Sequence, residues 1–369
     1  MVHFKAINGL RFIAFLPIFF LHSCGGELLY TLTLAALDMF FLLSGFLTGY
    51  GRIQDFSSSE QAKATKQGIW HYNVQYMLQK LRVFYPWHIV CFLWCLLIIF
   101  LSPATAGFVP HTLTEWIWKT PLHLLLLQSW SCEPNIKFCF NGVTWFLSSL
   151  MFCYALSPLL LALLARVYRK WGKCSLYIVG GMALLLKATP YIFEADLSIS
   201  DDFTSLYDKD IHSWPPLRLL DFCLGMSAGI ILRMTSAPKI CRNNIIQYIS
   251  VFLLLFSAYY IPGPITLLLS TIWLYTLVAA TSAVSKLLSF GMFTFLGKLV
   301  MPTFLTHNLV MKSLRGLGLH YPRSSYLCRL FCHILAAYPT QAMAEFLTEK
   351  MINILSVRYH AKAIPPNSM

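Results

Sequence analysis

The first fifty residues form two hydrophobic segments in close succession, and both contain ionisable side chains. The first segment covers residues 7–24 and the second covers residues 28–50. Each is long enough to cross a bilayer, which takes about 20 mostly apolar residues. The first carries Arg11 and His22, and the second carries Asp38. Because an ionisable group inside a membrane span is costly, the pattern predicts that these side chains face a protein interior.

The spacing of Arg11 and His22 predicts that both lie on one face of one helix. At about 100° per residue, eleven positions return to within about 20° of the starting direction. At about 1.5 Å per residue, the two side chains lie about 16 Å apart along the helix axis. Arg11 would be near the start of the helix and His22 near its end. This arrangement suits one long, thin ligand that is contacted at two depths of the membrane.

Composition indicates a membrane protein throughout, because hydrophobic residues make up 57% of the chain and charged residues only 12%, about half the soluble norm. We expect an all-α, polytopic membrane helix bundle of about ten transmembrane helices. It would form one integral-membrane domain over residues 1–357, followed by a cytoplasmic tail over 358–369. The first segment lacks a small-residue cleavage site, so we expect a retained helix. The predicted spans are 7–24, 28–50, 83–104, 143–165, 174–193, 215–235, 244–261, 263–283, 291–312 and 326–350.

The net charge of +13 is distributed as in a multi-pass membrane protein, not as in a nucleic-acid binder. Basic residues cluster in alternate loops, and the acidic loop 194–214 falls on the opposite side. The positive-inside rule then places both termini in the cytoplasm, and we expect a cell-membrane location. The outer loop 313–325 is an exception to this charge pattern, because the basic residues Lys312, Arg315 and Arg323 are assigned to it. The basic groups assigned to the cytoplasm are Lys5; Arg52, Lys63, Lys66, Lys80 and Arg82; Arg166, Arg169, Lys170 and Lys173; Arg233, Lys239 and Arg242; Lys286; and Arg358 and Lys362.

Several blocks of the chain together resemble the acyltransferase-3 family of integral-membrane O-acyltransferases. The start of the chain resembles the family in Asn8-Gly9-Leu10-Arg11, in His22 and in the run from Asp38 to Phe46. Members typically use acyl-CoA to modify sugars, so the resemblance implies an acyl-CoA donor, which we expect to be acetyl-CoA. The chain departs from the family pattern at a few positions. The family's serine and tyrosine are replaced by Val300 and Met301, its glutamates by Leu150 and Met151, and its closing proline by Met351. Later blocks that resemble the family are Thr144–Ser148, Arg218–Gly225, Leu296–Lys298 with His307, and Glu349-Lys350.

We interpret His22 as the general base, because an imidazole with a pKa near 6.5 suits removal of a hydroxyl proton at neutral pH. The alternative is a histidine that fixes helix packing through a hydrogen bond. Arg11 is predicted to hold a CoA phosphate or the polar arm of the donor, or to be a topology anchor that snorkels to the interface. Asp38 is predicted to orient His22 or to neutralise Arg11, with a structural ion pair as the alternative.

The remaining site candidates come from the later blocks. Lys80 and Arg82 precede Pro86 in a segment, 51–82, that we expect along the cytoplasmic interface. Their resemblance to basic family positions makes them candidate CoA ligands, with a solvated loop as the alternative. Four further residues are candidates for binding the acceptor substrate, although Arg218 and Asp221 also suit a structural pair and His307 suits a contact with His22. These four are Trp145, Arg218, Asp221 and His307.

Cys132 and Cys139 share an outer loop with six residues between them. A disulfide between them is plausible in an oxidising compartment, and two free thiols are the alternative. No paired cysteine or histidine spacing typical of metal sites occurs, so we expect neither a bound metal nor a bound cofactor.

We therefore predict a membrane O-acyltransferase that takes an acyl group, expected to be acetyl, from acyl-CoA. Its acceptor would be a hydroxyl of a carbohydrate or lipid-linked glycan. Acyl-CoA would enter at the cytoplasmic end, near Arg11, and His22 would activate the hydroxyl in the outer half of the membrane. A membrane transporter or proton-coupled channel is the main alternative, because intramembrane Arg, His and Asp also build proton relays. A catalytically silent scaffold is a third reading.

Overall fold

The computed structural model describes residues 4–54, 59–105, 107–196, 212–235, 237–260 and 263–318, together with residue 334. This described part consists of α-helices and short 3-10 turns without a β-strand, which confirms the predicted all-α membrane bundle. Apart from residue 334, the predicted tenth span lies outside the described residues, as do Glu349 and the tail 358–369.

Four helices are long and apolar enough to cross a membrane, and they include both segments that open the sequence. They are α1 (Phe4–Cys24), α2 (Glu27–Arg52), the Tyr72–Leu101 part of α4 (Ser59–Leu101), and α7 (Trp145–Trp171) with the turn before it. Two shorter apolar helices are α10 (Asn244–Tyr260) and α11 (Pro264–Ala279). The total of ten spans stays a prediction.

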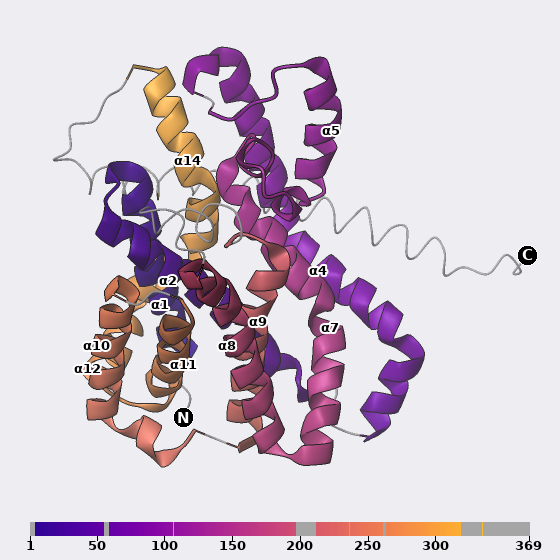
Figure 1. Cartoon of the computed structure of the whole chain (residues 1–369), viewed down its shortest axis with the longest axis vertical. Helices are drawn as coiled ribbons and strands as arrows, with labels where there is room; N and C mark the ends of the chain where they lie inside the picture. Colours follow the sequence, from indigo (N-terminus) through magenta and orange to yellow (C-terminus); the bar gives the residue numbers. More distant parts are fainter. Residues whose placement is uncertain are drawn as a thin grey trace, which may run out of the picture.

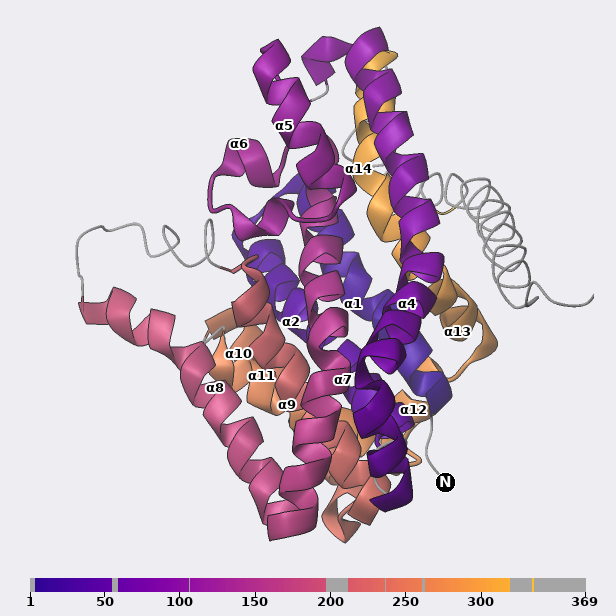
Figure 2. The same cartoon turned by 90° about the vertical axis from the view of Figure 1, so that its right-hand side faces the viewer.

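Most of the segment 51–82, which is expected along the cytoplasmic interface, forms one helix with the span that follows it. Helix α4 is continuous from Ser59 to Leu101 and includes Pro86 (Figure 2). Lys80 therefore lies on a bundle helix, whose turns hold it beside other helices. The interfacial location of this segment stays a prediction.

The bundle is closed at one end by the connection between α4 and α7. In both views α5 (Leu113–Leu124) lies at the end of the bundle away from α12, and Figure 2 shows α6 (Pro134–Lys137) beside it (Figures 1 and 2). Helix α1 runs toward this cap, so His22 lies near the cap and Arg11 lies deeper. The other elements are α8 (Lys173–Asp196), α9 (Pro215–Thr235), α12 (Ala283–Leu288), α13 (Gly291–Lys298), α14 (Val300–Gly316), η1 (Pro103–Thr105), η2 (Gln128–Trp130), η3 (Gly142–Thr144) and η5 (Lys239–Arg242).

Glycines bring α2 and α9 into direct backbone contact. A Cβ atom added to Gly45 would collide with the carbonyl oxygen of Phe222, and one added to Gly225 would collide with that of Leu42. Both glycines begin a Gly-xxx-Gly repeat, completed by Gly49 on α2 and by Gly229 on α9. Such repeats let helix backbones approach closely in membranes. The crossing holds the ionisable groups of the two helices within reach of one another.

Candidate active site

His22 lines a cavity of about 340 Å³ beneath the cap, here called the His22 cavity. Its imidazole is accessible from this space, although it lies at the end of a membrane-length helix. Among the described residues, no group hydrogen-bonds to that imidazole. The packing role considered for His22 therefore has no hydrogen bond to support it within the described part of the chain. The rest of the lining is Gly107, Phe108, Phe138, Gly142, Val143, Trp145, Asn308 and Lys312.

His307 on α14 lies directly beside His22. The two ring centroids are 5.0 Å apart at an interplanar angle of 52°. The contact that the sequence suggested across the bundle is therefore formed. His307 is fully buried, so only His22 of the pair is open to the cavity.

The hydrogen bond of His307 fixes which of its nitrogens can act as a base. Its Nδ1 lies 2.6 Å from the backbone oxygen of Phe304, one turn earlier in α14. Because a carbonyl oxygen only accepts, Nδ1 carries the hydrogen, and Nε2 keeps the lone pair in the neutral ring. An oriented imidazole thus stands beside His22, and in its neutral form it is able to accept or relay a proton through Nε2.

Arg11 lines a second cavity of about 260 Å³, here called the Arg11 cavity. Its guanidinium donates to the side chain of Asn8 at 3.3 Å and is only half-buried. Helices α7 and α14 contribute to the walls of both cavities, through Tyr154 and Phe304 here and through Trp145 and Lys312 in the His22 cavity. The structure is therefore consistent with the predicted common face of Arg11 and His22.

Two lysines accompany Arg11, and only one of them was proposed from the sequence. Lys80 places its ammonium group 4.1 Å from the ring centroid of Tyr154, which lines the cavity. Lys298 lines the cavity itself and is exposed. Arg82 is half-buried and is not part of the lining, because two residues turn it about 200° around α4 from Lys80. The cavity thus combines an apolar wall with three nearby cations.

Phe146 and Phe304 link the wall of the Arg11 cavity to residues beside His22. Both line the Arg11 cavity, and their ring centroids are 5.2 Å apart. Phe304 also lies 5.8 Å from His307, and Phe146 follows Trp145, which lines the His22 cavity. An extended ligand reaching from Arg11 to His22 would pass these two rings.

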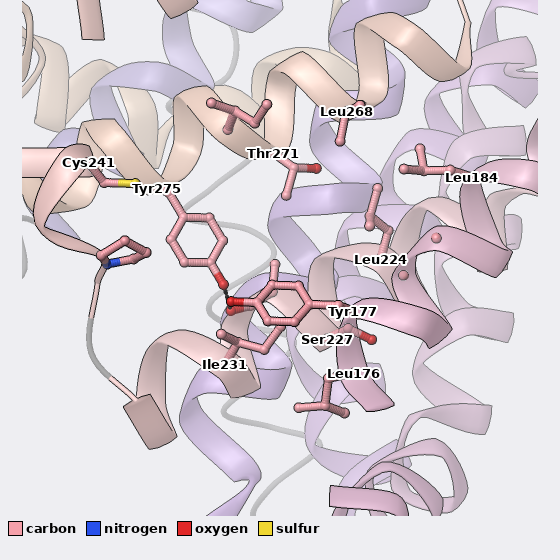
Figure 3. Close-up of a pocket in the computed structure, with 15 residues that line it drawn as sticks. Leu176, Tyr177, Leu184, Leu224, Ser227, Ile231, Cys241, Leu268, Thr271 and Tyr275 are labelled. Carbon is pink, nitrogen blue, oxygen red and sulfur yellow. Dashed lines mark hydrogen bonds between the residues drawn. The ribbon is translucent and has the colours of Figure 1, made fainter. Parts of the chain in front are cut away.

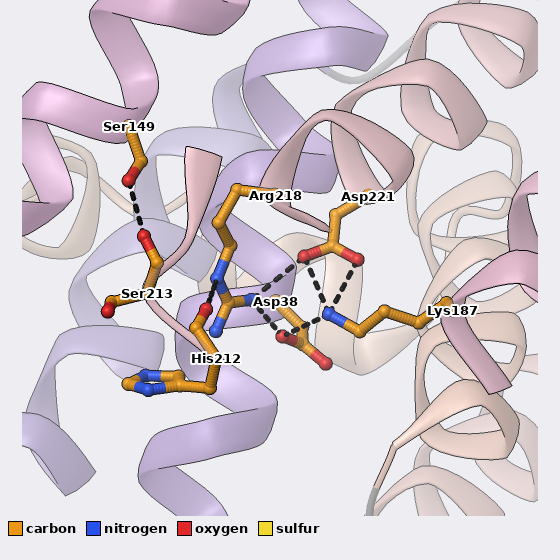
Figure 4. A network of polar contacts seen from close by, with 7 residues as sticks. All are labelled: Asp38, Ser149, Lys187, His212, Ser213, Arg218 and Asp221. Carbon is orange, nitrogen blue, oxygen red and sulfur yellow. Dashed lines mark hydrogen bonds and ion pairs between the residues drawn. The ribbon is translucent and has the colours of Figure 1, made fainter. Parts of the chain in front are cut away.

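Asp38 belongs to a buried cluster of four charged residues rather than to the histidine pair. Its carboxylate accepts from the Arg218 guanidinium and lies 3.5 Å from the Lys187 ammonium group. Asp221 lies 2.8 Å from Arg218 and 2.9 Å from Lys187. Figure 4 shows two cations and two carboxylates held together by α2, α8 and α9. The structure thus gives Asp38 the ion-pair role that was the alternative for it, and gives it no contact with His22 or Arg11.

The charged cluster is next to the His22 cavity, because Arg218 lies beside Trp145, which lines that cavity. The Arg218 guanidinium lies 5.9 Å from the ring centroid of Trp145 and donates to the backbone oxygen of His212 at 2.5 Å. Arg218 and Asp221 are fully buried and line neither cavity, whereas Trp145 does. Of the four proposed acceptor-binding residues, the structure therefore places Trp145 at the His22 cavity and His307 immediately behind His22.

Sequence reasoning passed over Lys187, Lys298 and Lys312. Lys187 is a single lysine inside the predicted span 174–193, and an intramembrane lysine is itself a signal of a buried partner. Lys312 was read only as an exception to the charge pattern. Lys312 in fact lines the His22 cavity, and its ammonium group donates to the backbone oxygen of Phe140 at 3.2 Å.

The predicted disulfide between Cys132 and Cys139 is not formed, and both thiols are free. Cys132 is exposed before α6, whereas Cys139 is buried after it. Helix α6 therefore separates the two thiols.

We expect a maleimide applied without reductant to label Cys132 readily and to leave Cys139 unlabelled. Burial both blocks access to Cys139 and raises the pKa of its thiol to about 11, so little thiolate exists at pH 8. Peptide mass spectrometry before and after unfolding in denaturant measures both sites. Labelling of Cys132 only after reduction would indicate a disulfide and contradict the structure.

The fold, together with the His22 and Arg11 cavities, defines an integral-membrane protein with a polar site inside a helix bundle. The profile of the acyltransferase-3 family, described as an acyltransferase domain, matches residues 4–340. The chain belongs to this family, which confirms the resemblance found in the sequence. It is similar to the acyltransferase MdmB of Streptomyces mycarofaciens, with 30% identity over 253 residues. That match covers 63% of this chain and 58% of MdmB, so the chain matches little more than half of that relative. No solved structure matches the chain significantly.

Proposed function

We propose that this protein is a membrane acyltransferase that transfers an acyl group from acyl-CoA to a hydroxyl of a carbohydrate or lipid-linked glycan. The observation that carries the proposal is the accessible imidazole of His22 beside the oriented imidazole of His307. Family membership supports the reaction class. The donor, the acceptor and the cell-membrane location with both termini in the cytoplasm are parts of the same proposal.

The Arg11 cavity is the proposed donor site. A CoA thioester carries phosphates at one end and an acyl group at the other. Arg11, Lys298 and Lys80 offer cations for the phosphates, and guanidinium groups suit bidentate phosphate contacts. The acyl end would point toward Phe146 and Phe304. Two closely spaced rings favour a short acyl group, so acetyl is the proposed donor group.

The His22 cavity is the proposed acceptor site. Its aromatic lining of Phe108, Phe138 and Trp145 suits the faces of a sugar ring. His22 would accept the proton of the hydroxyl while its oxygen attacks the thioester carbon. A new C–O bond forms, the C–S bond breaks, and the proton passes to the departing CoA thiolate. Lys312 and Asn308 provide donors for the oxyanion that forms during the attack.

Purified protein with acetyl-CoA and an acceptor should release free CoA thiol in step with ester formation. Mass spectrometry of the glycans and lipids of cells with and without the gene identifies the acceptor by a fixed acyl mass increment. A transporter would move solute without releasing thiol, so thiol release distinguishes the two readings. Absence of both thiol and acyl increment would contradict the proposal.

Replacing Arg11 with lysine should raise the apparent KM for acyl-CoA by about tenfold and lower kcat much less. Lysine keeps the charge but loses the planar fork that makes bidentate contacts. Loss of one hydrogen bond to a charged group costs about 1.5–3 kcal/mol, and lost uniform binding appears in KM. Arg233→Lys is the matched control, because Arg233 is exposed at the end of α9 and lines neither cavity. An unchanged KM in Arg11→Lys would remove Arg11 from the donor site.

A further inference from the structure

A third cavity lies outside the proposed reaction path, between α8, α9 and α11. Its volume is about 340 Å³, and its walls are mostly apolar (Figure 3). Leu176 and Leu184 of α8, Ile231 of α9 and Leu268 of α11 form much of the surface. This volume lies near the lower end of small-ligand pockets, which span about 300–1,000 Å³. It is therefore suited to one slender apolar group.

Gly181 leaves part of this cavity empty. A Cβ atom built on it would meet nothing within 4 Å, although the residue lies in a helix and lines the cavity. A Cβ atom at this position would therefore meet no neighbouring atom, and a longer side chain would begin in open space. The position therefore offers a substitution that fills the cavity.

One polar group in the lining lacks a partner within the described part of the chain. The hydroxyl of Ser227 is buried and makes no hydrogen bond there, whereas the nearby Tyr275 hydroxyl donates to the backbone oxygen of Ala228 at 2.6 Å. A buried hydroxyl without a partner is costly. A ligand with an acceptor oxygen near Ser227 would remove that cost.

The end of the cavity at η5 is basic. Pro238 and Cys241 line the cavity, and the adjacent Lys239 and Arg242 are exposed. These charges lie on the side that the positive-inside rule assigns to the cytoplasm. Anionic lipids are enriched in that leaflet, and each nearby basic residue strengthens their binding. The site thus pairs an apolar chamber with a cationic entrance.

We propose that this cavity binds one acyl chain of an anionic glycerophospholipid from the surrounding bilayer. The chain would fill the space beside Gly181, and Ser227 would donate to an ester carbonyl oxygen. Lys239 and Arg242 would hold the phosphate. The proposal assigns a binding site separate from the acyl-transfer site, and it stands whether or not the proposed reaction is correct.

Cys241 allows a test on the unaltered protein, because its thiol lines the cavity. The protein is placed in nanodiscs of phosphatidylglycerol or of phosphatidylcholine with the same acyl chains, and maleimide labelling of each cysteine is followed by peptide mass spectrometry. We expect phosphatidylglycerol to slow labelling of Cys241 by about tenfold relative to phosphatidylcholine. Labelling of the exposed Cys132 should be the same in both lipids. Equal rates at Cys241 in the two lipids would overturn the proposal.

Two pairs of variants separate the chamber from its entrance. Gly181→Phe should abolish the protection of Cys241, whereas Gly51→Phe should not, because Gly51 also has open space around it but lies on α2, outside the cavity.

Lys239→Ala with Arg242→Ala should reduce the preference for phosphatidylglycerol by about tenfold. Lys170→Ala with Lys286→Ala removes two other exposed lysines and should preserve it. Full protection in folded Gly181→Phe would exclude the chamber, and an unchanged preference after loss of Lys239 and Arg242 would exclude the headgroup contact.

Discussion

Replacing His22 with alanine is expected to reduce acyl transfer by about 10²–10⁴-fold, which is the usual contribution of a general base. The expected cost in stability is small, because His22 lines a cavity and no described group hydrogen-bonds to its imidazole. Even an interhelical hydrogen bond in a membrane protein is worth only about 0.6 kcal/mol on average. The activity should therefore fall far more than the melting temperature.

The measurement combines initial rates of CoA thiol release with a thermal unfolding curve of the same preparation. His111→Ala is the matched control, because His111 is exposed near the cap and lies outside both cavities. It should leave the rate unchanged. Near-normal turnover of well-folded His22→Ala would show that His22 is not the base, and the adjacent His307 would then be tested by the same substitution.

Replacing Lys187 with methionine is expected to lower the free energy of unfolding by about 3–5 kcal/mol, because it removes one cation from a buried charge cluster. Asp38 and Asp221 would then share only the Arg218 guanidinium. One negative charge would be left uncompensated inside the bundle. Lys170→Met is the control, because Lys170 is exposed at the end of α7, and it should change stability little.

A second substitution tests the charge balance directly. Lys187→Met combined with Asp38→Asn has one cation and one carboxylate, and it should regain part of the lost stability. Equilibrium unfolding in detergent measures all variants. A folded Lys187→Met protein with wild-type stability would show that the cluster does not require its second cation. Because Arg218 lies against Trp145, we also expect the single variant to weaken acceptor binding.

The pattern of one helix was sufficient to predict the relation between Arg11 and His22. Helical periodicity alone determines which face of α1 a residue occupies and how far along the axis it lies. The two residues accordingly line two cavities that share the walls α7 and α14. Apolar segments of spanning length likewise predicted a membrane helix bundle. The family resemblance rested on local blocks of sequence, which the family profile over residues 4–340 confirms.

The side chains that contact His22 and Asp38 depended on which helices are neighbours in the bundle. Asp38 lies on α2, the helix that follows Arg11 and His22 in the sequence. The close contact at Gly45 and Gly225 nevertheless brings α2 against α9 and pairs Asp38 with Arg218. Lys187 joins them from α8. Periodicity describes one helix at a time, whereas the contact of two helices depends on the shapes of both surfaces and on which other helices compete for them. The sequence by itself therefore determined the membrane bundle and the directions of Arg11 and His22, and only tertiary packing decided that His22 meets His307 and that Asp38 belongs to a buried ion cluster.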